Sequence, residues 1–60
     1  MRVELDVSIN LSHHSGGQQV ITPAHASIEI CPDMVIFSTK ERVINVPMAR
    51  VRAIVYQTVL

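Results

Sequence analysis

Hydrophobic and polar residues alternate at the start of the chain. Over residues 2–12 the apolar side chains fall on every second position, as Val3, Leu5, Val7, Ile9 and Leu11. Successive side chains of a strand point to opposite faces, so this period gives one apolar face and one polar face. A helix would scatter the same side chains around its circumference. The pattern therefore predicts a first strand over residues 2–12.

Further strand-like runs follow, separated by turn residues. Alternation resumes over residues 24–31. Pro32-Asp33 then predicts a tight reversal that pairs residues 25–31 with residues 34–39, because proline and aspartate suit the central positions of a type I turn. The charged residues 38–42 predict the next reversal, with a loop of about three to five residues.

The C-terminal third admits two interpretations. Val43–Val46 is strand-like and stops at Pro47, which cannot donate to a central ladder. A short helical turn is expected near residues 47–51, followed by a last strand over residues 52–60. The alternative is one continuous helix from Pro47. The density of β-branched residues favours the strand.

These elements predict an all-β fold: a small antiparallel meander of about five strands, able to curl into a half-open barrel. Residues 1–60 are expected to form a single domain. The order of predicted elements over residues 34–57 is a hairpin, a turn that begins with proline, and a last strand. This order is similar to that of Sm-like, SH3-like and pleckstrin-like barrels, which implies a small barrel. A shared fold carries no function by itself.

Residues 12–23 form one long loop that is expected to be flexible. Gly16-Gly17 can adopt positive φ, and such a loop is either mobile or functional. Val20-Ile21 either packs down or adds a short strand. Hydroxyl, imidazole, amide and glycine N–H groups in this loop, together with clustered arginines, can bind phosphate or carboxylate. The candidate ligand-binding residues are Ser12, His13, His14, Ser15, Gly16, Gly17, Gln18, Arg42, Arg50 and Arg52.

Size and composition favour self-association. The chain has 60 residues, of which 48% are hydrophobic, and a single cysteine, Cys31, which excludes an internal disulfide. Chains this short usually need disulfides, a bound metal or a partner chain to be stable. An eleven-residue strand spans roughly 36 Å, more than a domain of this size, so the first strand must bend or project. A projecting strand invites pairing with a second copy, and a homo-oligomer is expected.

Charge and the absence of targeting signals limit the partners. Five basic residues balance five acidic residues, so the formal net charge is zero. Binding to DNA is not expected, because phosphate neutralisation normally shows as a basic excess. No signal peptide or apolar run long enough to cross a membrane is visible, so the chain is expected in the cytoplasm and away from membranes.

No catalytic constellation is visible. His13, His14, His25 and Cys31 match no standard metal-ligand spacing, so no metal and no cofactor are expected. On one strand, His25 and Cys31 would lie roughly 20 Å apart. Glu4 and Asp6 share one strand face, where solvation or pairing with arginines is the ordinary outcome.

The sequence therefore predicts a non-enzyme. The favoured function is a homo-oligomeric interaction protein that engages a protein partner, as an adaptor or inhibitor of the kind found among accessory proteins of bacterial viruses. The alternative is an oligomeric module that binds a nucleotide or RNA through the 12–19 loop and the arginines. Few aromatic residues are present for base stacking, which weakens the RNA version.

Overall fold

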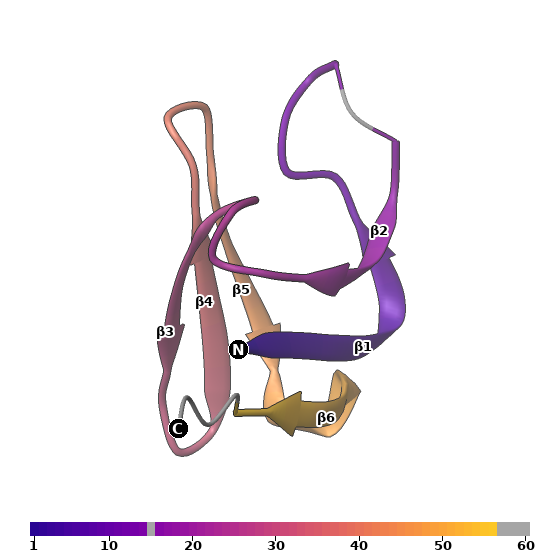
Figure 1. The fold of residues 1–60 in the computed structure, drawn as a ribbon, viewed down its shortest axis with the longest axis vertical. Helices are drawn as coiled ribbons and strands as arrows, with labels where there is room; N and C mark the ends of the chain where they lie inside the picture. Colours follow the sequence, from indigo (N-terminus) through magenta and orange to yellow (C-terminus); the bar gives the residue numbers. More distant parts are fainter. Residues whose placement is uncertain (15, 57–60) are drawn as a thin grey trace.

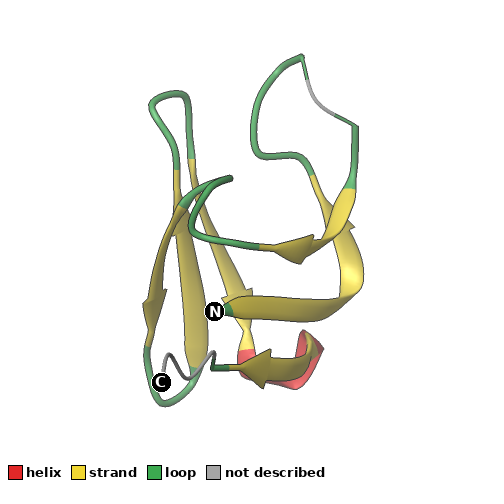
Figure 2. Cartoon of the chain, viewed as in Figure 1, coloured by secondary structure: helices red, strands yellow, loops and turns green. Residues whose placement is uncertain are grey.

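Strands dominate the computed structural model, which describes residues 1–14 and 16–56 (Figures 1 and 2). The elements are β1 (Arg2–Ile9), β2 (Gln18–Ile21), β3 (Ser27–Ile30), β4 (Met34–Ser38), β5 (Val43–Pro47), the 3-10 turn η1 (Met48–Arg50) and β6 (Val51–Val55). The all-β prediction is confirmed, as is the short helical turn after β5. The described residues hold no helix with the length and hydropathy that a membrane crossing requires.

The strands form two antiparallel sheets, ordered β2-β1-β6 and β3-β4-β5. The first sheet brings the last strand beside the first, and the second is a plain meander. In Figure 1, β3, β4 and β5 run along the long axis, while β6 and the first part of β1 lie across it. The two sheets stay separate, so the barrel is not closed.

β1 bends sharply along its length (Figure 1). Against β2, Glu4 pairs with Val20 and Ile9 with Gln18. The four residues 5–8 of β1 therefore face a single residue of β2. Such a bulge bends a strand and increases its twist. The strand ends at Ile9 rather than at residue 12, and Leu11 turns into the core from the loop beyond it.

Both predicted reversals of the second sheet are present. The backbone N–H of Cys31 donates to the carbonyl of Met34 at 2.9 Å, closing the β3–β4 turn. The N–H of Thr39 donates to the carbonyl of Arg42, also at 2.9 Å, closing the β4–β5 turn. The second loop, residues 39–42, has the expected length.

The C-terminal segment is a strand at Val51–Val55 and not a helix. Residues 57–60 of the predicted last strand lie outside the described residues. Val20 and Ile21 form part of a short strand, β2, which is one of the two alternatives left open by the sequence. With β2 the described residues contain six strands, compared with about five expected from the sequence pattern.

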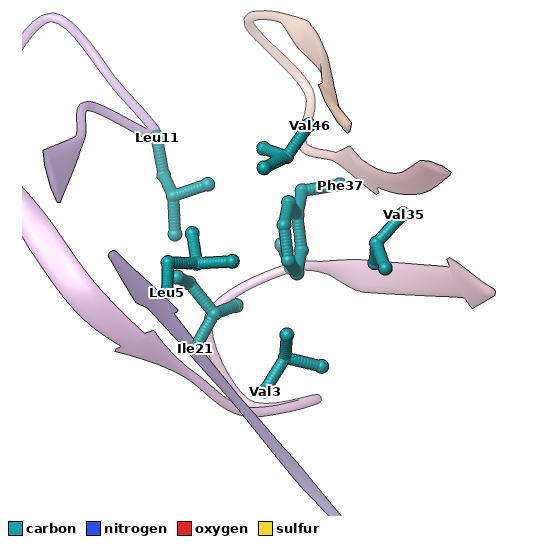
Figure 3. Close-up of a cluster of buried hydrophobic side chains, with 8 residues drawn as sticks. Val3, Leu5, Leu11, Ile21, Val35, Phe37 and Val46 are labelled. Atoms are coloured by element: carbon teal, nitrogen blue, oxygen red, sulfur yellow. The ribbon is translucent and has the colours of Figure 1, made fainter. Parts of the chain in front are cut away.

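Both sheets contribute to one small core. In Figure 3 the ring of Phe37 lies in the middle of this core, with Leu5 of β1 on one side and Val35 on the other. The buried hydrophobic residues are Val3, Leu5, Leu11, Ile21, Ala26, Val35, Phe37 and Val46. Burying such a side chain fully stabilises the fold by roughly 1.5–3 kcal/mol. The small size of this core leaves many of the remaining hydrophobic residues partly exposed.

Candidate functional site

The turn that joins β4 to β5 (residues 39–42) holds the beginning of the long loop. Three of its side chains bond to backbone atoms about thirty residues earlier in the chain. Thr39 Oγ1 donates to the Leu11 carbonyl at 3.0 Å, Arg42 Nη1 donates to the Asn10 carbonyl at 3.0 Å, and Glu41 Oε2 accepts from the His13 N–H at 2.9 Å. The loop is therefore anchored over residues 10–13.

Thr39 is central to this arrangement. Besides donating to Leu11, its Oγ1 accepts the backbone N–H groups of Glu41 and Arg42, each at 3.2 Å. A threonine hydroxyl has one donor and two acceptor positions, and here all are in use. The same oxygen thus closes its own turn and binds the distant loop.

A second fixed corner joins β2 to β3. The Thr22 N–H donates to Nδ1 of His25 at 3.1 Å, while the His25 N–H donates to the Thr22 carbonyl at 2.9 Å. This reciprocal pair resembles the capping box of a helix start, with Pro23 at the first position. Because Nδ1 accepts a hydrogen bond, the neutral imidazole carries its proton on Nε2.

A hollow of about 270 Å³ lies between the long loop, this corner and the 39–42 turn. Its lining residues are Leu11, Ser12, Gln18, His25, Thr39, Lys40 and Glu41. The side-chain oxygen Oε1 of Gln18 is buried and has no hydrogen-bond partner among the described residues. An unsatisfied buried acceptor costs about 1–3 kcal/mol, so Gln18 gains stability if its amide turns and finds a donor.

The candidate loop residues divide into two groups. Ser12 and Gln18 line the hollow, whereas His13 and His14 are exposed beside it. Gly16 and Gly17 are exposed, and neither has a positive φ, contrary to the conformational role expected of them. Ser15 lies outside the described residues.

At Gly17, glycine is required by the lack of space for a Cβ and not by a positive φ. A Cβ built on Gly17 would lie 2.8 Å from Cβ of Ser8, closer than two such atoms normally approach. A Cβ on Gly16 would meet nothing within 4 Å. Gly17 therefore permits the loop to return closely past the bent part of β1.

The three candidate arginines are not brought into one cluster. Arg42 lies before β5 and Arg50 lies beyond its end, so the five residues of β5 separate them by about 16 Å of strand rise. Arg52 lies on β6, where its Nε is 3.7 Å from Oδ1 of Asp6, with both side chains largely exposed. The expectation that Arg42 reaches the other two from an adjacent strand fails because β6 pairs with β1 and not with β5.

The remaining polar residues are arranged for ordinary structural contacts. Arg2 Nε lies 2.9 Å from Oε2 of Glu4 on the exposed face of β1. Partial burial, and then the carboxylates of Glu29 and Asp33, raise the pKa of the Cys31 thiol. A raised pKa keeps the sulfur protonated and a poor nucleophile. Within residues 1–14 and 16–56, no three His, Cys, Asp or Glu side chains gather as metal ligands.

Partly exposed apolar side chains gather on the second sheet. The outward row of β4 includes the half-buried Met34 and Ile36, and Val43 at the start of β5 is 64% exposed. β5 is an edge strand that pairs with β4 on one side. Residues 43–49 contain no ionisable side chain. The β5 edge therefore carries no charge that would oppose pairing, and Pro47 at its end is the one β5 residue without a backbone N–H.

Among residues 1–14 and 16–56, the features that stand out are an all-β fold, a polar hollow beside the 39–42 turn, and the uncharged edge of β5. No protein-family model matches the chain, and no curated protein or solved structure matches it either. Its function is therefore argued from its own residues.

Proposed function

We propose that this chain is a non-enzymatic interaction protein that forms a homodimer through the edge of β5. The uncharged edge with exposed Val43 carries the proposal. The free edge of β5 offers backbone C=O and N–H groups to a second chain, except at Pro47, which has no N–H. A small core and a large apolar fraction favour the burial of this edge against a copy of itself.

The other edge strands are poorer candidates for self-pairing. Pairing β3 with its copy would bring two Glu29 carboxylates onto adjacent strands, and pairing β6 would do the same with Arg52. Like charges across strands are destabilising. β2 is uncharged but has only four residues. β5 combines greater length with the absence of charge.

The simplest pairing is antiparallel and symmetric about Asn45, the middle residue of β5. A two-fold axis there places each Asn45 opposite its counterpart, and Ile44 opposite Val46 of the second copy. Ile44 and Val46 face the core, so the pairing extends the core of each subunit. Two five-residue strands bury less than the roughly 1,200 Å² of a standard interface, so we expect reversible association.

Opposite charges at Asn45 provide the test. Asn45 is exposed in the monomer, so Asn45→Lys and Asn45→Asp leave its core intact. Each variant alone should remain monomeric in light scattering, because two like charges then meet at the axis. An equimolar mixture of the two should recover the dimer mass, since each introduced lysine then faces an introduced aspartate.

Gln19 of β2 provides the matched control, as an exposed polar residue on the other uncharged edge. Gln19→Lys should associate like the unchanged chain. The proposal is wrong if the two Asn45 variants dimerise alone as well as when mixed, or if Gln19→Lys is the substitution that abolishes association.

Protein partners belong to the same proposal. A partner strand can add to the β5 edge, because strand addition uses the same backbone groups as self-pairing. We place this activity in the cytoplasm, since an unpaired cysteine suits a reducing compartment. Nucleotide or RNA binding through the arginines has less support, because Arg42 and Arg50 lie at opposite ends of β5.

A further inference from the structure

The hollow beside the 39–42 turn has the size of a small-molecule site. Its volume of about 270 Å³ lies just below the roughly 300–1,000 Å³ of typical ligand pockets. Its walls come from four separate parts of the chain, and two of them are anchored by side-chain hydrogen bonds. The walls are therefore formed before any ligand arrives, and the occupant must be small.

The charges of the lining are balanced. Lys40 is exposed and has no ion pair or hydrogen bond within residues 1–14 and 16–56. Glu41 uses Oε2 to accept the His13 N–H, which leaves Oε1 for another donor. One cation and one anion at the same hollow suit a ligand that carries both charges. A nucleotide would bring its phosphate charges to a single lysine and would be repelled by Glu41.

The uncharged side chains around the hollow limit how a ligand can be oriented in it. Thr39 has no hydrogen-bonding capacity left, and His25 Nδ1 is occupied, so Nε2–H is the free donor of the imidazole. Gln18 needs a donor for Oε1. The terminal torsion of a glutamine is soft, so this amide can turn its oxygen toward the hollow that it lines. Leu11 also lines the hollow, but only 5% of it is exposed because its side chain belongs to the core.

We propose that the hollow binds a free amino acid through its ammonium and carboxylate groups. The carboxylate lies against Lys40 and His25, and the ammonium group lies against Glu41 and the amide oxygen of Gln18. The site is separate from the β5 edge, so this inference holds whether or not the chain forms dimers.

The test is a titration of the ¹⁵N-labelled full chain with L-leucine up to about 20 mM, followed by amide NMR shifts. We expect saturating shifts confined to the lining residues. Lys40→Gln and Glu41→Gln should each weaken binding about two- to fivefold, as expected for exposed ion pairs. Glutamine at position 41 still accepts the His13 N–H, so the loop stays anchored. Arg50→Gln, an exposed cation on η1, is the control and should leave binding unchanged.

Three related probes test the class of ligand. N-acetyl-L-leucine lacks the ammonium group and L-leucinamide lacks the carboxylate, so both should bind more weakly than L-leucine. Adenosine monophosphate should bind more weakly still. The inference is overturned if L-leucine gives no saturating shifts, if Arg50→Gln weakens binding as much as Lys40→Gln, or if the nucleotide binds most tightly.

Discussion

Replacing Thr39 by valine isolates the hydroxyl that joins the 39–42 turn to the long loop. Valine keeps the branched shape and removes Oγ1. The Leu11 carbonyl loses its donor, and the N–H groups of Glu41 and Arg42 lose their acceptor. The N–H of Glu41 is exposed and can bond to water, whereas Arg42 and Leu11 lie in more buried surroundings.

The magnitude follows from these three bonds. Net hydrogen bonds contribute about 0.5–1.5 kcal/mol each, so the total loss is about 1–3 kcal/mol once the exposed N–H is discounted. For a domain of this size 1 kcal/mol lowers Tm by about 4–8 °C, so Thr39→Val should unfold roughly 5–20 °C lower. Thr39→Ser keeps the hydroxyl and loses one half-buried methyl group, which costs less than about 1 kcal/mol.

Thermal unfolding by circular dichroism, at one protein concentration for all variants, gives the order of stability. Hydrogen exchange at the His13 amide adds a local readout, because this N–H is protected only while the loop stays anchored. We expect Thr39→Val to accelerate exchange at His13 much more than Thr39→Ser. If Thr39→Val is as stable as Thr39→Ser, the hydroxyl does not hold the loop and this reasoning fails.

Two further predictions concern Cys31 and Gly17. The reaction of Cys31 with a disulfide reagent should rise with pH later than for an ordinary thiol, because its raised pKa lowers the thiolate fraction at each pH. Glu29→Gln should lower that pKa and speed the reaction at pH 8, whereas Glu41→Gln should not; equal rates in the two variants would refute the assigned cause. Gly17→Ala should destabilise the fold by about 1–3 kcal/mol through the contact with Ser8, whereas Gly16→Ala should be neutral or slightly stabilising. Equal melting temperatures for the two alanine variants would contradict the close approach.

The strands could be predicted from local sequence patterns. Alternation placed β1, and the turn chemistry of Pro32-Asp33 placed the β3–β4 reversal. The spacing of Thr22, Pro23 and His25 is the sequence signal of the corner between β2 and β3, which alternation does not reveal.

No local sequence pattern predicts the hollow. The bonds that build it join residues about thirty positions apart, and no period or motif encodes them. Lys40 and Glu41 therefore read as ordinary loop charges. The expected arginine cluster failed for a related reason: the sequence implied that neighbouring strands in the chain pair, whereas η1 turns the chain away and β6 pairs with β1.

In the proposed homodimer, a second copy of the chain covers the β5 edge. Light scattering on the unmodified chain, from micromolar to millimolar concentration, tests it most directly. We expect the weight-average mass to rise with concentration from 6.7 kDa toward twice that value. A mass that stays at 6.7 kDa up to the highest concentration would contradict the claim.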